Sequence, residues 1–167
     1  ISRVTVRKAI QGLVAEGVLR QRHGSGTFVS RTGGRVEQPL SRLSSFTEDM
    51  KSRGLVPTAS WLERSVGMPT SAEAMILGLA PTERVARFHR LRLADNEPMA
   101  IERAVVPLRI LPDPSIVANS LYDALDSVGM RPVRAVQRLN AESVGSADAA
   151  LLGIAAGSAA LAIERIS

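Results

Sequence analysis

The sequence predicts an α+β fold in two parts: a basic helix-and-hairpin segment over residues 1–30, and a neutral domain over residues 40–167 with a mostly antiparallel sheet. Residues 31–39 are polar, contain two adjacent glycines and lack apolar periodicity, which is typical of a linker. The whole net charge of +5 lies in residues 1–31, which hold six basic side chains and one acidic, whereas the rest holds 15 of each. Charge concentrated in one segment indicates a module that binds a polyanion.

The composition limits the classes of protein to which the chain can belong. Its 167 residues are 45% hydrophobic and 3% aromatic, an ordinary composition for a chain with a packed core. No apolar run approaches membrane-spanning length, and no signal-peptide pattern is present. The absence of cysteine excludes disulfides and thiolate metal sites, and the two histidines, His23 and His89, lie far apart in the sequence. We therefore expect a cytoplasmic protein with no metal, no cofactor and no membrane partner.

The first element is an amphipathic helix that begins after Ser2, a good N-cap residue, and ends at Gly17. Two short strands follow over residues 18–21 and 27–29, and a basic turn with glycines separates them. A helix followed by a basic hairpin ends a winged helix, in which the helix enters the major groove and the hairpin contacts the minor groove or phosphates. A solvated helix and turn is the alternative, and the concentration of charge favours nucleic acid.

Helix starts and strand-like segments alternate through the second domain. A capping box at residues 45–48 opens a helix that runs to about Arg53 and stops at Gly54. Further helices are predicted from residue 70 to Gly78, from a cap at residues 119–120 to Gly129, and after a cap at Ser146. Strands are predicted over residues 58–66, 87–107 (a hairpin), 132–143 and 159–166.

The hairpin over residues 87–107 organises the second domain. A three-residue loop at 95–97 would give one apolar face and one face that carries charge. This register pairs Phe88 with Ala104, Arg90 with Glu102, Arg92 with Ala100, Leu91 with Ile101 and Leu93 with Met99. Same-face neighbours on a strand are about 6.5 Å apart, so Arg90 and Arg92 can hold one anion together. A solvated cross-strand salt bridge with Glu102 is the alternative.

Two helix starts add further groups that favour an anion. Thr47 and Ser120 offer hydroxyl groups beside the free amides of a helix start, and Glu102 can accept hydrogen bonds from sugar hydroxyls or an amide. Each cap alone also fits a purely structural role. Catalysis has little support, because no histidine has an evident partner and no nucleophile elbow or P-loop is present. We expect a binding protein and not an enzyme.

Residues 2–30, SRVTVRKAIQGLVAEGVLRQRHGSGTFVS, resemble the second half of the winged helix-turn-helix of GntR-family transcription regulators, through SRxTVRxA followed by GxGTFV. From about Pro39 onward the chain resembles the effector-binding UTRA domain of the HutC subfamily, which shares the chorismate-lyase fold. LSSFTEDMKSRG and RLRLADNEPMAIERAVVP carry this second resemblance. The chain is especially similar to repressors of N-acetylglucosamine and chitin catabolism, which respond to amino-sugar phosphates.

The resemblance implies two sets of site residues. The set that it places at operator DNA, on the recognition helix and the wing, is Ser2, Arg3, Thr5, Arg7, His23, Gly24 and Gly26. The set that it places at the effector is Phe46, Thr47, Arg90, Arg92, Glu102 and Ser120. In this second set the arginines and hydroxyls would hold the phosphate, and Glu102 would hold the sugar.

The chain departs from the family pattern at both ends. The family's winged helix begins with two further helices, and its effector domain continues past a strand such as 159–166 with another glutamate and a tyrosine near the ligand. We therefore expect the sequence to be part of a longer protein, and we expect weak DNA binding from the part given.

The resulting hypothesis is a homodimeric repressor whose affinity for operator DNA is controlled by N-acetylglucosamine 6-phosphate or glucosamine 6-phosphate. One alternative keeps the regulator and changes the ligand to another sugar phosphate, a phosphonate or a carboxylate. The other alternative is a lyase that uses a chorismate-lyase-like pocket, and the basic N-terminal segment argues against it.

Overall fold

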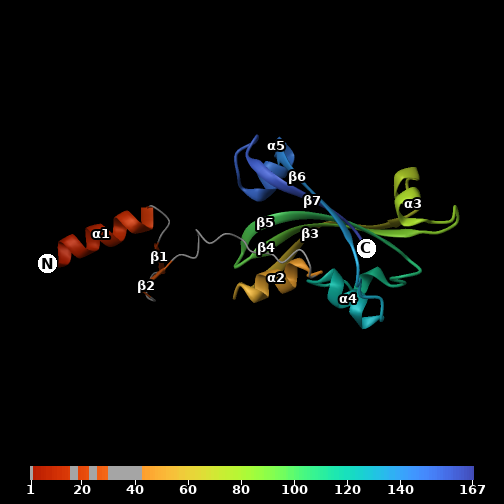
Figure 1. The fold of residues 1–167 in the computed structure, drawn as a ribbon, viewed down its shortest axis with the longest axis horizontal. Coiled ribbons are helices and arrows are strands. Elements are labelled where there is room, and N and C mark those ends of the chain that lie inside the picture. Colours follow the sequence, from red (N-terminus) through yellow and green to blue (C-terminus); the bar gives the residue numbers. More distant parts are fainter. Residues whose placement is uncertain (1, 16–18, 23–25, 30–42) are drawn as a thin grey trace. The chain divides into compact units, whose positions relative to one another are not determined.

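The computed structural model describes residues 2–15, 19–22, 26–29 and 43–167 (Figure 1). The chain divides into two compact units, Ile1–Pro39 and Leu40–Ser167. The predicted linker, residues 31–39, and the predicted wing residues His23 and Gly24 lie outside the described residues.

The first unit contains a helix and a hairpin. α1 (Arg3–Ala15) begins after Ser2, whose hydroxyl oxygen accepts a hydrogen bond from the Thr5 amide at 3.3 Å, so the predicted N-cap is confirmed. β1 (Leu19–Arg22) and β2 (Gly26–Val29) then pair in antiparallel fashion, as predicted for a helix followed by a hairpin.

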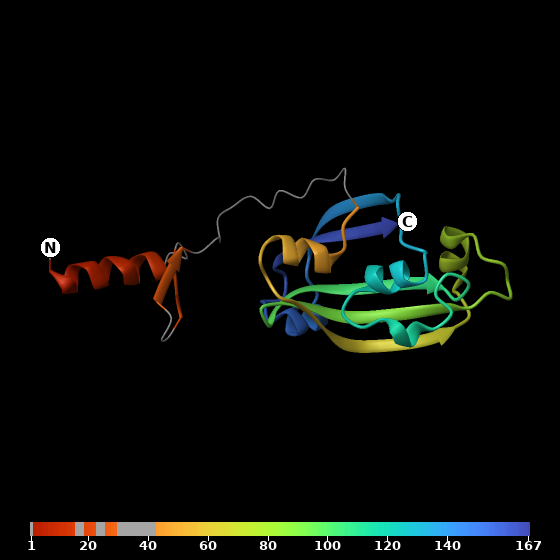
Figure 2. The ribbon, with the colours of Figure 1, turned by 90° about the horizontal axis from the view of Figure 1, so that it is seen from below.

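The second unit interleaves short helices with longer strands. In order these are α2 (Phe46–Ser52), β3 (Pro57–Gly67), α3 (Ser71–Leu77), β4 (Val85–Ala94), β5 (Glu97–Pro107), η1 (Pro114–Ile116), α4 (Leu121–Ser127), β6 (Val136–Ser143), α5 (Ser146–Leu152) and β7 (Ala159–Ile166). β3, β4 and β5 form one antiparallel sheet with β4 in the centre, and β6 and β7 form a separate antiparallel pair. The predicted α+β class is confirmed, although the strands form two sheets instead of one. α4 covers one face of the three-stranded sheet, and α5 lies on the opposite face beside β5 (Figures 1 and 2).

Two predicted boundaries of the second unit are wrong. The strand predicted over residues 132–143 begins only at Val136, which pairs with Ile166 of β7. Ser146 is already the first helical residue of α5, so the N-cap is Gly145, which provides no side-chain hydrogen bond. The capping box predicted at the start of α2 is confirmed, and α3 opens with a second capping box, formed by Thr70 and Glu73.

The turn of the central hairpin also differs from the prediction. Asp95 and Asn96 have φ angles of 51° and 68°, which correspond to a two-residue type I′ turn and not to a three-residue loop. Leu93 therefore pairs with Pro98, and Met99 forms a bulge before the predicted register resumes at Arg92. The bulge keeps Arg90 opposite Glu102, as predicted.

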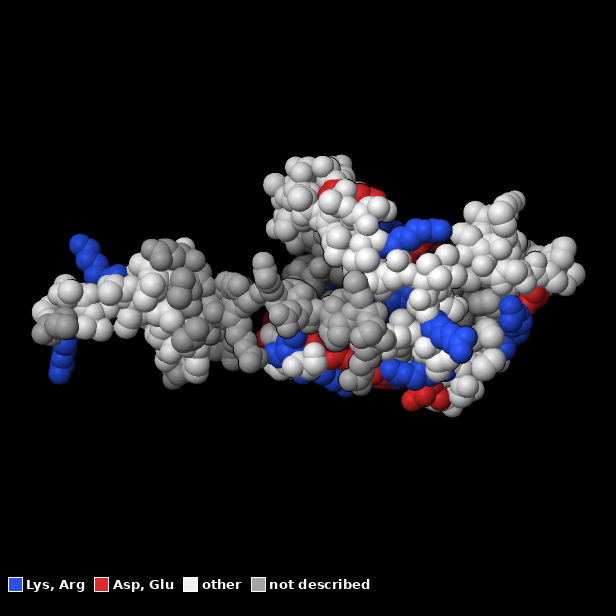
Figure 3. All heavy atoms as spheres, in the orientation of Figure 1, with Lys and Arg blue, Asp and Glu red and all other residues white. Residues whose placement is uncertain are grey.

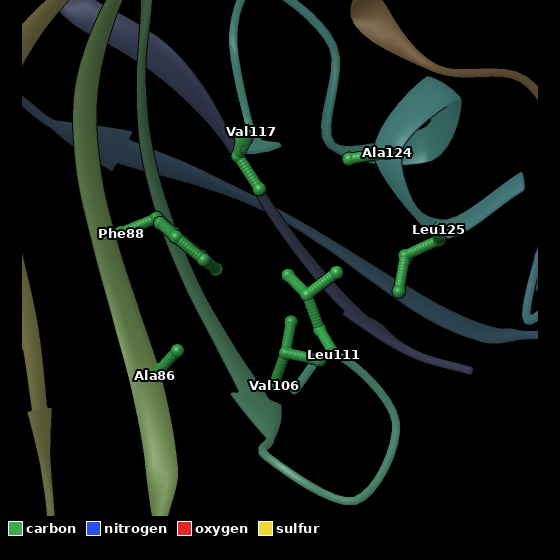
Figure 4. Close-up of a cluster of buried hydrophobic side chains, with 7 residues drawn as sticks. All are labelled: Ala86, Phe88, Val106, Leu111, Val117, Ala124 and Leu125. Carbon is green, nitrogen blue, oxygen red and sulfur yellow. The ribbon is translucent and has the colours of Figure 1, made fainter. Parts of the chain in front are cut away.

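The hydrophobic core lies between the three-stranded sheet and the segment that includes α4 (Figure 4). Its members are Ala86, Phe88, Val106, Leu111, Val117, Ala124 and Leu125. Burial alternates along β4, and the face with Phe88 is the buried one. Arg90 and Arg92 lie on that same face, so the packing that buries the core also buries both arginines.

Ser45→Ala should lower the free energy of unfolding of the second unit by about 1 kcal/mol, the usual cost of removing an N-cap. The Ser45 hydroxyl accepts from the Glu48 amide at 3.1 Å, and the Glu48 carboxylate accepts from the Ser45 amide at 2.8 Å. Urea denaturation measures the loss. Ser71→Ala is the control, because Ser71 is exposed and already helical, and we expect a change within about 0.5 kcal/mol. Equal losses in both variants would contradict the capping role.

Candidate functional site

Two buried arginines form the centre of the candidate site. Arg90 is 0% exposed and Arg92 is 2% exposed, and both come from the middle of β4. Both pair with Glu102 on β5: Arg90 donates to one carboxylate oxygen, and Arg92 Nη1 donates to the other at 3.1 Å. The side chain of Glu102 is 26% exposed. The ion pair is therefore buried on its arginine side, unlike the solvated salt bridge that the sequence left open as the alternative.

The starts of two helices meet this arginine pair. Arg92 Nη2 donates to the Thr47 hydroxyl at 3.1 Å, and its guanidinium lies 4.7 Å from the centre of the Phe46 ring. Thr47 and Phe46 form the first turn of α2. Arg90 Nη1 reaches the other helix, because it donates to the backbone carbonyls of the residues just before Ser120, at 3.3 and 3.4 Å. The structure thus brings α2, α4 and the hairpin together at the arginines.

Ser120 itself is buried at the start of α4, where its hydroxyl oxygen accepts from the Asp123 amide at 3.1 Å. Its contact with the arginine pair is indirect, through the carbonyls of Ala118 and Asn119 that Arg90 holds. The structure therefore links the predicted effector residues Phe46, Thr47, Arg90, Arg92 and Glu102 through contacts with Arg92 and Glu102, and it places Ser120 beside them.

The charges of this cluster do not balance. Among the described residues, the ion pairs of Arg90 and Arg92 are both with Glu102, so two cations share one carboxylate. Each arginine also has a buried Nε with no hydrogen-bond partner in the described part of the chain. Burial lowers the pKa of Arg92, Glu102 raises it, and the neighbouring Arg90 lowers it further. A site with excess positive charge and unused donors suits an anion.

Sequence reasoning missed Trp61, the single tryptophan of the chain, which lies opposite Arg90 on β3. Its ring centre is 5.2 Å from the Arg90 guanidinium and 3.9 Å from that of Arg64. The register between β3 and β4 shifts between Trp61 and Glu63, so periodicity alone could not have placed Trp61 beside Arg90. The one sequence signal for a role of Trp61 was that the chain contains a single tryptophan.

Two further arginines around α2 were also missed. Arg165 on β7 donates to the Ser44 carbonyl at 2.8 Å and to the Tyr122 hydroxyl at 3.1 Å. Arg131 pairs with Glu48 at 2.7 Å, and a hydrogen bond from the Ser45 amide, with Arg131, lowers the pKa of Glu48. Nothing in the sequence distinguishes these two arginines from the other basic residues.

The predicted DNA-binding residues of α1 are exposed. Ser2, Arg3, Thr5 and Arg7 are all open to solvent, and Arg3 and Arg7 stand four residues apart on one side of the helix. Gly26 begins β2 with a φ of +108°. Basic side chains project from α1, which contains no acidic residue, whereas basic and acidic side chains are interspersed on the visible face of the second unit (Figure 3). Contact of these residues with DNA stays a prediction.

The described residues show neither a membrane span nor a metal cluster. Within that part of the chain, no helix has both the length and the apolar character needed to cross a bilayer. A group of three or more histidine, aspartate or glutamate side chains able to hold a metal ion is also absent from the residues that the structure describes.

Comparison with known proteins identifies the family. The model of the UTRA domain matches residues 52–167, and the model of the bacterial regulatory proteins of the gntR family matches residues 1–29. This chain belongs to the GntR family and carries a UTRA domain. The family consists of transcription regulators and not of enzymes, which confirms the prediction that the chain is not an enzyme and removes the lyase alternative.

Individual relatives agree with this assignment. The chain is 39% identical to the HTH-type transcriptional repressor NagR of Bacillus subtilis, over 99% of this chain and 68% of NagR. It is 31% identical to the HTH-type transcriptional regulator GgaR of Escherichia coli, over 84% of this chain and 56% of GgaR. The crystal structure of PhnF from Mycobacterium smegmatis matches with a TM-score of 0.70 at 26% identity, over 99% of this chain and 73% of PhnF.

Proposed function

We propose that the chain is part of a cytoplasmic, homodimeric repressor whose affinity for operator DNA is controlled by a phosphorylated amino sugar. The effector is N-acetylglucosamine 6-phosphate or glucosamine 6-phosphate. The observation that carries this proposal is the buried pair Arg90 and Arg92, which shares a single carboxylate. The similarity to NagR, which is named a transcriptional repressor, supports the assignment as a repressor.

The phosphate is held by the arginine pair in this proposal. Two guanidinium groups can each donate two charge-assisted hydrogen bonds to one phosphate, and such bidentate contacts are strong and geometrically specific. Thr47 lies within hydrogen-bond distance of Arg92 and supplies a hydroxyl, and Ser120 supplies a second from the start of α4. Glu102 accepts hydrogen bonds from the sugar, and Phe46 packs beside the site.

Control of DNA binding follows from the two-unit organisation. A dimer presents two DNA-binding units to a pseudo-palindromic operator, and the spacing of those units has to match the spacing of the half-sites. An effector that binds one arrangement of the dimer better than the other shifts the affinity for the operator. The effector domain provides the binding site, and residues 1–30 provide part of the DNA-binding surface.

Calorimetric titration with sugar phosphates and their unphosphorylated parents tests the effector class. We expect glucosamine 6-phosphate and N-acetylglucosamine 6-phosphate to bind, and we expect the parent sugars to bind at least tenfold more weakly, because they lack the charge-assisted contacts. Glucose 6-phosphate measures the contribution of the amino or acetamido group. Equal affinities for the phosphates and the parent sugars would contradict the proposal.

Arg3→Ala and Arg7→Ala should each weaken operator binding by about 1–3 kcal/mol in a protein with the complete DNA-binding domain. Both side chains are exposed near the start of α1, where a recognition helix contacts base edges. Fluorescence anisotropy with labelled operator at physiological salt measures the loss. Gln11→Ala on the same helix is the control, because Gln11 is exposed and uncharged. Unchanged binding in both arginine variants would show that α1 does not recognise the operator.

A further inference from the structure

Glu102 already makes contacts that an anionic ligand would make with the arginine pair. One carboxylate oxygen accepts from Arg90 and the other accepts from Arg92 Nη1 at 3.1 Å, so a single group receives donors from both guanidiniums. A phosphate held by the same two arginines needs those same donors. We propose that Glu102 is an internal competitor for the arginine pair, which the effector's phosphate must displace. This inference rests on the proposed effector site.

The difference in burial shows which partner can move. Arg90 and Arg92 are almost completely buried, and Arg90 is also fixed by the carbonyls of Ala118 and Asn119, and Arg92 by Thr47. The side chain of Glu102 is 26% exposed. A displaced Glu102 carboxylate can be hydrated at once, whereas a displaced arginine would leave its charge in the protein interior. Displacement therefore moves Glu102 and leaves the arginines in place.

The neighbours of Glu102 on β5 leave room for this exchange. Ala100 and Ala104 lie two residues before and after it on the same face of the strand, opposite Arg92 and Phe88. Both are small side chains that do not confine the carboxylate along the strand. Within the described residues, the ion pairs of Glu102 are with Arg90 and Arg92 alone, so no other cation holds it in place.

The exchange makes the site respond to two parts of the ligand at once. A phosphate carries a charge of about −1.5 to −2 near neutral pH and repels a carboxylate that stays on the same guanidiniums. Once displaced, the Glu102 carboxylate has lost its two guanidinium donors, and a hydroxyl, amide or ammonium group of the sugar can replace them. Inorganic phosphate displaces Glu102 into water and supplies no donor in place of the guanidiniums, so it binds weakly, whereas a phosphorylated amino sugar supplies both the phosphate and a new donor. Glu102 thus prevents occupation of the site by free phosphate.

Titration of the full chain with inorganic phosphate tests this role. Glu102→Gln removes the competing charge, so we expect inorganic phosphate to bind at least about tenfold more tightly to this variant than to the wild-type protein. The preference for glucosamine 6-phosphate over inorganic phosphate should fall in parallel. Calorimetry gives the affinities, and the fluorescence of Trp61, 5.2 Å from Arg90, reports occupation of the site. Glu164→Gln is the matched control, because it makes the same change in charge at an exposed carboxylate on β7 that pairs with Arg138.

If Glu102→Gln melts cooperatively and binds inorganic phosphate no more tightly than wild type, the proposal is overturned. If that variant does not fold, Glu102→Asp replaces it, because the shorter side chain cannot reach both guanidiniums at once. A several-fold gain in affinity for phosphate then supports the proposal, and no gain overturns it. The effector class is tested separately, because failure of the wild-type protein to bind any sugar phosphate would contradict the proposed function. The ratio of the affinities of variant and wild type for inorganic phosphate tests the role of Glu102 alone.

Discussion

Arg92→Ala is expected to abolish the preference for a sugar phosphate over its parent sugar, with a loss of more than about tenfold in affinity for glucosamine 6-phosphate. A charge-assisted contact of this kind contributes about 1.5–3 kcal/mol. Arg92 is the residue that joins the two sides of the site, because it donates to Glu102 on β5 and to Thr47 on α2, each at 3.1 Å. Affinity for the parent sugar, which makes no contact with the phosphate site, should change little.

The charge balance predicts that this variant stays folded. Removal of Arg92 leaves Arg90 and Glu102 as a one-to-one pair, in which no buried charge lacks a partner. A thermal melt checks that the fold is retained. Arg103→Ala is the matched control, because Arg103 lies on the next strand, pairs with Asp148 and is 58% exposed. If Arg92→Ala and Arg103→Ala bind glucosamine 6-phosphate equally well, the effector site lies elsewhere.

The positions of the helices and strands could largely be predicted from the sequence, because local chemistry determines them. The capping boxes at the starts of α2 and α3 each involve a hydroxyl and a glutamate three residues apart, so a short window of sequence contains the whole signal. The pairing of Arg90 with Glu102 was also predictable, because a single turn connects the two strands. The error at Leu93 and Met99 arose where a two-residue turn and a bulge give nearly the same register as a three-residue loop.

The burial of the site could not be predicted in the same way. Periodicity marks one face of β4 as apolar through Leu91 and Leu93, but it does not say which face the rest of the chain covers. The core packs on the other face, around Phe88, and so buries two arginines for which the sequence left a solvated salt bridge open as an alternative. The meeting of α2 and α4 at these arginines depends on contacts between residues that lie 28 or more positions apart in the chain.

Phe88→Ala tests that assignment of the core, and it should lower the free energy of unfolding by about 3–5 kcal/mol, the usual cost of truncating a buried aromatic side chain. Phe88 is 1% exposed and belongs to the cluster with Val106, Leu111 and Val117 (Figure 4). Its ring also lies 6.0 Å from that of Trp61, measured between ring centres. Truncation leaves a cavity whose walls are residues on two strands and on the segment before α4. Because these elements hold the walls in place, the walls cannot collapse into the cavity.

Leu91→Ala is the comparison that decides which face of β4 carries the core. Leu91 is only partly buried and lies on the opposite face, so its truncation should cost less than about 2 kcal/mol, the lower end of the range for a buried leucine. Urea denaturation followed by circular dichroism measures both variants without relying on the fluorescence of Trp61, whose environment Phe88→Ala alters. If Leu91→Ala costs as much as Phe88→Ala, the core lies on the leucine face, and Arg90 and Arg92 belong to a solvated surface instead of a buried anion site.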